Sequence, residues 1–356
     1  MAMGFSCVIY DFKYPDLTEI AFNSYEKHKK GALKNHGFHV VNLGAPVQSV
    51  KVNPLAPAYI QTLPQAEETA EALIYALKKS DHTSGADQFF TQSAINMLAA
   101  VIYYLAQKDN GRESSFPSVL KMLQLDYEEL FIQLQQQPDL LPLIAPFVSA
   151  YKKGAIDQLE GQLGTLRINL GRLATKEVYT VFSKDEVDLR INHPSSPSIL
   201  VLASAPETQE INSACYSIVV NRLTKLMNRK GCLPSALIID EVPTLYIHRM
   251  ENLLATARSN KVAILLGLQE LPQFRQQYGK LAAETICSVI ANVISGQVQN
   301  KETLEWLERL FGKIIQVKKG INMDRNRHGQ SASEHLDHAI PAARIAQLGS
   351  GELSGR

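Results

Sequence analysis

The chain has 356 residues, 45% of them hydrophobic, which suffices for a large core in about two domains or in one domain with an insertion. Its 36 Lys and Arg nearly balance 35 Asp and Glu, so the overall charge of +1 favours neither polyanions nor acidic partners. No apolar run approaches the roughly 20 residues that span a bilayer. The four cysteines lie far apart, which favours a reducing cytosolic compartment over a disulfide or metal framework.

The first sixty residues predict an α/β unit. Phe5–Tyr10 is a short apolar run typical of a strand buried on both faces, and it stops at Asp11. A helix is expected over about 16–30 and a second strand over Gly37–Val41. Strand, helix and strand at this spacing indicate a parallel sheet.

A helical insertion is expected between two α/β segments, which divides the chain into 1–63, 64–187 and 188–356. In the insertion, apolar residues recur at helical spacing. Helices are predicted at Ala66–Lys78, Gln88–Ala106, Tyr127–Gln137 and around Gly161–Gly164. Further strands are predicted at Ser198–Ala203, Leu237–Ile239, Val262–Leu266 and near Val293–Gly296, with helices between them. The polar stretch Ile321–His338 has no apolar period and is predicted to be a mobile loop.

The strongest chemical signal is the stretch Ser235–Pro243, an apolar strand that ends in Asp240 and Glu241. This pattern is typical of a Walker B strand, in which one acid holds Mg²⁺ and the next acts as general base towards the attacking water. Asp240 is expected to hold the metal and Glu241 to be the base. Alternatively, Asp240 caps a following helix and Glu241 lies in its first turn.

Two further side chains are candidates. Gln269 follows the next strand, where its carboxamide can sense a water near a terminal phosphate; the alternative is a turn residue bonded to backbone. Arg258 lies near the end of a helix, from which it could reach a neighbouring subunit's nucleotide as an arginine finger. The alternative is a cation that stabilises the helix C-terminus.

Ile238–Lys313 contains in order the segments IIDEVPTL, ATARSNKVAILLGLQE, YGK, ISGQV and LFGK. In this order they resemble TraG/TraD-like type IV secretion coupling proteins, especially conjugation and mobilisation ATPases of Bacteroides type. Val8–Asp16 resembles the Asp-x-Lys strand end of that family, and Val52–Leu55 resembles its Asn-Pro-Leu element. The resemblance covers most of the chain.

The resemblance implies a RecA-like P-loop NTPase sheet with an inserted all-α domain that is implicated in contacts with DNA and relaxosome proteins. It implies ATP and Mg²⁺ as cofactors of the full-length protein, which would form a hexameric ring at the inner membrane with this part in the cytoplasm. The parent protein would drive relaxase-bound single-stranded DNA into a type IV secretion channel. For DNA contact, the residues themselves offer the cations Lys152, Lys153, Arg167, Arg172 and Lys176, without an aromatic ladder, and a solvated helix face explains them equally well.

The sequence departs from the family at one point, because it contains no Gly-x-x-x-x-Gly-Lys-Ser/Thr loop. In the family this phosphate-binding loop precedes the strand that matches Phe5–Tyr10. The chain is therefore expected to begin just downstream of the loop, without the P-loop strand and helix, and to bind no ATP by itself. Two other functions stay open: a non-hydrolytic docking module for relaxosome proteins, and a DNA translocase of the FtsK type.

Overall fold

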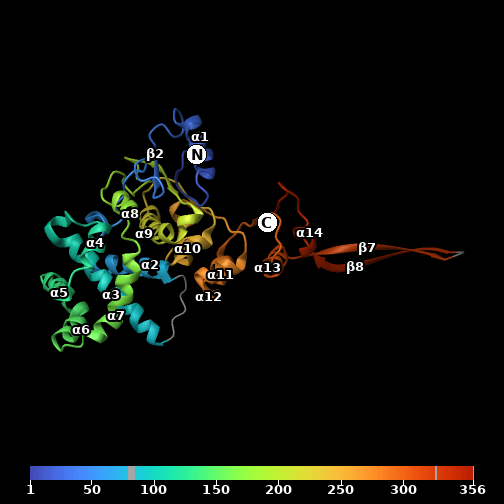
Figure 1. Cartoon of the computed structure of the whole chain (residues 1–356). Helices are drawn as coiled ribbons and strands as arrows, with labels where there is room; N and C mark the ends of the chain where they lie inside the picture. The colour runs from blue at the N-terminus through green and yellow to red at the C-terminus, as the bar shows by residue number, and fades with distance from the viewer. Residues whose placement is uncertain (79–84, 325–326, 356) are drawn as a thin grey trace.

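The computed structural model describes residues 1–78, 85–324 and 327–355. Its centre is a five-stranded parallel sheet in the order β2-β3-β1-β4-β5 (Figure 1). The five strands are β1 (Ser6–Asp11), β2 (Gly37–Asn42), β3 (Ser198–Ala203), β4 (Ser235–Ile239) and β5 (Val262–Leu266). These strands confirm the α/β pattern expected from the sequence.

Apolar residues fill β1 and β3 because helices cover both faces of the sheet. Every residue of these two strands is buried. Side chains alternate between the faces: Cys7 and Ile9 pack in a core with Ala21 of α1 (Asp16–His28). Val8 and Tyr10 pack in the other core with Tyr216 of α9 (Gln209–Met227). Along the chain, α10 (Met250–Ala257) connects β4 to β5, and α11 (Leu271–Tyr278) and α12 (Lys280–Val289) follow β5.

Helices fill most of the described part of the chain between residues 63 and 181, as expected, and they form one end of the molecule (Figure 1). The helices are α2 (Leu63–Lys78), α3 (Gly85–Gln107), α4 (Phe116–Met122), α5 (Tyr127–Leu134), α6 (Leu141–Lys152), α7 (Ile156–Gly171) and α8 (Lys176–Val181). Helix α3 lies at their centre, in contact with α2, α4, α6 and α7. The boundaries of the all-α region at 63/64 and 187/188 stay an interpretation.

One expectation about apolar runs was wrong. Among the described residues, the helix Asp87–Gly111 is long and apolar enough to cross a membrane. The protein buries 78% of its most apolar window, so these side chains form the core of the all-α region.

The sequence predicts a loop over Ile321–His338, and this prediction is wrong for the described residues, which belong to two β-strands; residues 325–326 lie outside the described part of the chain. Strands β7 (Lys313–Asp324) and β8 (Arg327–His338) pair antiparallel and project from the body (Figure 1). Apolar alternation marks a strand only where one face packs on a core, and this sequence lacks it. The remaining C-terminal elements are β6 (Ile294–Ser295) paired with β9 (Ser354–Gly355), α13 (Lys301–Phe311) and α14 (Ala342–Ala346).

Candidate functional site

Asp240 and Glu241 lie where the chain leaves the carboxyl end of β4. The backbone N–H of Asp240 still donates to the carbonyl of Tyr10 (3.1 Å), so Asp240 continues the pairing with β1. Glu241 then adopts a left-handed conformation (φ 57°), which turns the chain out of the sheet. Such a conformation costs free energy for a residue other than glycine and is concentrated at functional sites.

Hydrogen bonds hold this turn from two neighbouring strands. The N–H of Val242 donates to the carbonyl of Gly267 (2.7 Å), just beyond β5. The hydroxyl of Thr244 donates to the carbonyl of Glu241 (2.7 Å) and lies 3.2 Å from the hydroxyl of Tyr10 in β1. A Cβ atom at Gly267 would lie 3.3 Å from the carbonyl oxygen of Ile239, so glycine allows this close approach.

The structure brings Glu241 and Gln269 together. Burial raises the pKa of the Glu241 carboxyl, while hydrogen bonds from the side chain and backbone N–H of Gln269 act in the opposite direction. Glu241 is 7% exposed, and its Oε1 has no hydrogen-bond partner in the described part of the chain. Both residues line a cavity of about 340 Å³, together with Gln209, Ser213 and Gln273. A buried acid with a free oxygen beside a carboxamide can accept a proton from a water between them.

Asp240 lies on the side of β1, where a second carboxyl group, that of Asp11, is its neighbour. Burial, and then the neighbouring charge of Asp11, raise the pKa of its carboxyl, whereas the charge of Lys13 and the backbone N–H of Phe12 lower it. Asp11 is completely buried; its Oδ2 accepts hydrogen bonds from the N–H (2.8 Å) and hydroxyl (2.6 Å) of Thr18. Its Oδ1 finds no partner among the described residues.

These surroundings fit a divalent cation. The carboxylates of Asp11 and Asp240 repel each other, and Oδ1 of Asp11 is buried without a partner among the described residues. A bound cation would offset this repulsion and contact the unpartnered oxygen. No group of three or more His, Cys, Asp or Glu side chains in the described residues forms a cage for a metal. Mg²⁺ at Asp240 would therefore take most of its ligands from water and phosphate oxygens, as Mg²⁺ usually does when it is bound by one or two carboxylates.

Asp11 and Lys13 are site residues to which the sequence pattern assigns no role. The signal was the Asp-x-Lys pattern at the end of the first strand. Their contribution depends on β1 lying next to β4, with Tyr10 opposite Ile239. Strand order cannot be read from the pattern along the chain, so their position beside Asp240 required the structure.

Arg258 lies near the amino ends of the strands, opposite the carboxyl ends that carry Asp240 and Glu241. It is exposed and follows α10, which returns the chain to the start of β5. The carbonyl of Lys261 accepts from Ser235 at the amino end of β4 (3.1 Å). A five-residue strand is roughly 17 Å long, so Arg258 cannot reach the Asp240 site of its own subunit.

Neither acid caps a helix, so the alternative explanation for the pair is wrong. Glu241 precedes a three-residue 3₁₀ turn, Val242–Thr244, to which its side chain donates or accepts no capping hydrogen bond. The next α-helix, α10, begins only at Met250. The pair is therefore not explained by local helix capping.

Sequence and structure comparisons agree on what the molecule is. The fold is RecA-like: the unbound form of the bacterial conjugative coupling protein TrwBdeltaN70 superposes with a TM-score of 0.68 at 12% identity, over 98% of this chain and 81% of that chain. TrwB in complex with ADP and Mg²⁺ gives 0.67 at 13% identity, over 99% and 82%. TrwB with a non-hydrolysable ATP analogue gives 0.67 at 12%, over 99% and 82%.

The chain belongs to the type IV secretory system conjugative DNA transfer family, whose model matches residues 4–339. Comparison with curated proteins gives no significant match. The family match selects the coupling protein for conjugative DNA transfer among the functions left open by the sequence. Proteins of this family are associated with the secretion system of the inner membrane.

Proposed function

We propose that this chain is the cytoplasmic motor domain of a conjugative coupling protein, in which ATP hydrolysis drives relaxase-bound single-stranded DNA towards the secretion channel. The observation that carries the proposal is the meeting of Asp240, Glu241 and Gln269 at one edge of the parallel sheet. Ligands of open α/β sheets bind at this edge, beyond the carboxyl ends of the strands.

Each residue has a distinct task in the proposal. Asp240 would hold Mg²⁺, which when bound screens the charge on the transferred phosphoryl group. Glu241 accepts the proton of the attacking water through its unpartnered Oε1. Gln269, hydrogen-bonded to Glu241, orients that water and reports its loss to α11, which begins two residues later.

The sequence contains no Gly-x-x-x-x-Gly-Lys-Ser/Thr motif, so the proposal takes the backbone cradle for the phosphates from a further segment. The structure offers a place for it at β5, the last strand of the sheet, to whose outer edge no described strand pairs. Leu265 of β5 is 62% exposed, although strands of parallel sheets are normally covered on both faces. We propose that this segment adds a strand and its loop beside β5.

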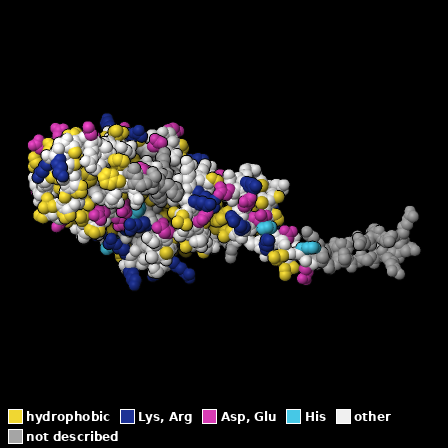
Figure 2. All heavy atoms as spheres, turned by 90° about the horizontal axis from the view of Figure 1, so that it is seen from below, with side chains coloured by type: hydrophobic (Ala, Val, Ile, Leu, Met, Phe, Trp, Pro, Cys, Tyr) yellow, Lys and Arg dark blue, Asp and Glu magenta, His cyan; other side chains and the backbone are white. Residues whose placement is uncertain are grey.

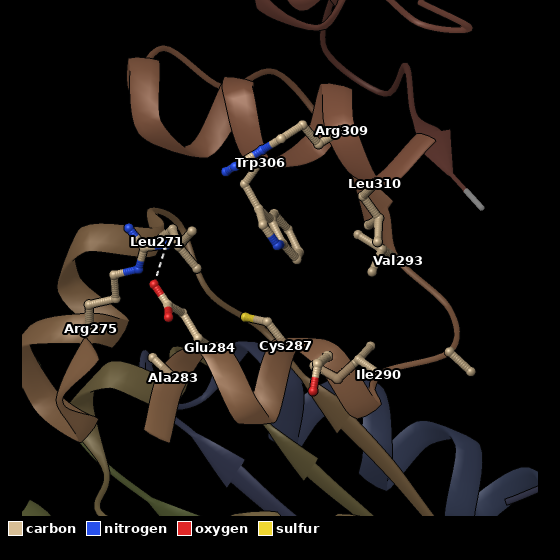
Figure 3. Close-up of a pocket in the computed structure, with 12 residues that line it drawn as sticks. Leu271, Arg275, Ala283, Glu284, Cys287, Ile290, Val293, Trp306, Arg309 and Leu310 are labelled. Carbon is tan, nitrogen blue, oxygen red and sulfur yellow. Dashed lines mark ion pairs between the residues drawn. The ribbon is translucent and has the colours of Figure 1, made fainter. Parts of the chain in front are cut away.

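A cavity beside α12 offers room for a further element. It has a volume of about 660 Å³ and separates α12 from α13. Figure 3 shows Trp306 of α13 pointing into the cavity towards Cys287 of α12, with Ile290 and Val293 at its side. Apolar side chains around so large a cavity leave dispersion contacts unmade, so a further element packed there would stabilise the fold.

The position of Arg258 bears on assembly. Since it cannot serve the site of its own subunit, a role as arginine finger requires a neighbouring copy, as in a ring. We therefore include a homo-oligomeric ring, with six subunits expected for the full-length protein, in the proposal.

The decisive test is ATP hydrolysis by the polypeptide extended with the coding sequence upstream of Met1. Glu241→Gln should lower kcat by about 10²–10⁴-fold with little change in KM, because the base acts on the chemical step. Asp240→Asn should raise the Mg²⁺ concentration needed for half-maximal rate. The printed chain alone should show no ATP binding by calorimetry.

A matched control is Glu207→Gln, which removes an exposed acid near α9. It should keep the unmodified rate. If Glu241→Gln hydrolyses ATP as fast as this control, Glu241 is not the base and the proposed mechanism is wrong.

A further inference from the structure

Helix α6 carries an apolar groove on the outside of the all-α region. The groove has a volume of about 440 Å³. Leu141, Ile144 and Val148 line it at spacings of three and four residues, so they form one stripe along the helix. Leu141 is 45% exposed, whereas Ile144 and Val148 are buried and form the floor.

Two lysines close one end of this groove. Lys152 and Lys153 line it, are exposed, and form no ion pair with an acidic side chain in the described part of the chain. Their place at the end of α6 is favoured by the helix dipole. The groove thus combines an apolar stripe with a positively charged end.

The other cations expected to contact DNA do not extend this charge into a track. Arg167 is used inside the fold: its Nη2 donates to the carbonyl of Leu125 (2.7 Å), and its guanidinium lies 4.0 Å from the centre of the Tyr127 ring. The residues that line the groove include no aromatic ring on which a base could stack. Its chemistry therefore fits a protein segment better than single-stranded DNA.

We propose that the α6 groove binds an amphipathic helical segment of a partner protein, with apolar residues at positions i, i+3 and i+7 and acidic residues at the end that meets Lys152 and Lys153. Helix α6 has 12 residues and is about 18 Å long, which matches a partner helix of about three turns. In the view from below, hydrophobic side chains and Lys or Arg side chains intermingle on the all-α end (Figure 2). The inference rests on the proposed function, since a coupling protein must recognise the proteins that accompany the DNA.

The test is fluorescence anisotropy with a labelled peptide of about 14 residues that has leucines at the stated spacing and three glutamates at its C-terminus. Binding should fall at least about tenfold in the double variant Lys152→Glu/Lys153→Glu, because two attractive charges become repulsive. It should fall similarly in Ala145→Trp, which fills the groove from an exposed position. Added salt should weaken binding to the unmodified protein.

The controls separate the groove from general charge and bulk. Arg172→Glu/Lys176→Glu changes two exposed cations outside the groove, and Ala174→Trp adds a ring at an exposed site there; both should bind normally. The same peptide with lysines in place of the glutamates should not bind. Circular dichroism should show equal folding of all variants.

Three outcomes overturn the proposal: no binding of the acidic peptide, equal loss in the control variants, or loss of only single-stranded oligonucleotide binding in Lys152→Glu/Lys153→Glu. The last would assign the lysines to DNA. Peptide binding needs no nucleotide, so its result is independent of the hydrolysis assay. If the protein binds the peptide but hydrolyses no ATP, the proposed motor function is wrong and the proposed peptide binding in the α6 groove is retained.

Discussion

The imidazole of His248 stacks on the ring of Tyr75, with ring centroids 6.1 Å apart and ring planes 8° apart. His248 lies on the segment that follows Glu241, and Tyr75 lies on α2, the first helix of the all-α region. Glu71 of α2 reinforces the contact, since its Oε2 is 3.0 Å from His248 Nε2 and 3.4 Å from an Nη atom of Arg249. The chain that leaves the candidate catalytic acids is thus packed directly on the helical region.

This contact should make stability depend on pH in a defined window. Burial, followed by the charges of Arg249 and Lys225, lowers the pKa of His248 to about 4, from the ordinary histidine value of 6.5. Glu71 would favour protonation, but its charge is shared with Arg249, and desolvation dominates. The unfolded chain therefore binds the proton more tightly than the folded chain. Stability is unaffected above pH 6.5 and falls between pH 6.5 and 4, by at most about 3 kcal/mol.

The measurement is urea unfolding from pH 7.5 to 4 for the natural chain and for His248→Gln. The free energy of unfolding of the variant should fall less steeply in this window. Substitution of the exposed His193 by Gln should leave the natural slope in place. Parallel curves for the natural chain and His248→Gln would contradict the prediction.

Arg222 should be the most costly single cation to remove. It is 7% exposed on α9, and its guanidinium donates to the carbonyls of Pro54 (3.1 Å) and Tyr59 (2.8 Å) and to the hydroxyl of Thr69 in α2 (2.9 Å). Burial lowers its pKa to about 10, so it stays charged at pH 7. Arg222→Met would leave two buried carbonyls without donors.

We expect Arg222→Met to lose about 2–4 kcal/mol of unfolding free energy in urea denaturation. Arg222→Lys keeps the charge but not the forked geometry, so it should not restore the loss. The exposed Arg172→Met should change stability by no more than about 0.5 kcal/mol. A loss at position 222 as small as that of the control would contradict the role of this side chain in joining α2 to the α/β core.

The sequence predicted the parts of the molecule whose pattern follows from burial. β3 and β5 were predicted with their observed bounds, because continuous apolar runs are the mark of covered parallel strands. Asp240, Glu241 and Gln269 could be grouped because the carboxyl ends of parallel strands share an edge. Lys13 could not be placed beside Asp240, since its position depends on strand order. The pairing of β7 with β8 was missed because the sequence of these strands has no apolar alternation.

Gly267→Ala should disturb the site more than the fold. The added methyl group would lie 3.3 Å from the carbonyl oxygen of Ile239 and 3.6 Å from the nitrogen of Glu241, so the strand ends must move apart slightly. Overpacking of this kind costs about 1–3 kcal/mol. A small shift of Glu241 should in addition lower ATP hydrolysis by the extended polypeptide at unchanged KM.

Thermal unfolding and steady-state kinetics of the same variant check both parts. Gly161→Ala is the control: a methyl group on this exposed position of α7 would meet only Phe90, at 4.0 Å, and alanine is the better helix former. It should keep its rate and lose no stability. If Gly267→Ala behaves like this control, the close approach between the strand ends is not needed for the site.

The open edge of β5 should make the 356-residue chain associate with copies of itself. No described strand pairs with this edge, and Leu265 of β5 is 62% exposed, so two copies can pair there and cover the leucine. Size-exclusion chromatography with light scattering should show a mass that rises with concentration. Leu265→Lys should return the mass to 39.5 kDa, because a lysine on an edge strand opposes pairing.

A second variant distinguishes pairing at the β5 edge from non-specific association through exposed apolar side chains. Ile132→Lys removes an apolar side chain of α5 that is 58% exposed, and it should not change the association. In the polypeptide extended upstream, the proposed strand beside β5 should cover Leu265 and abolish pairing through this edge. A mass that is independent of concentration in the printed chain would mean that the edge does not pair with a second copy, and a pairing that persists in the extended polypeptide would place the proposed strand elsewhere.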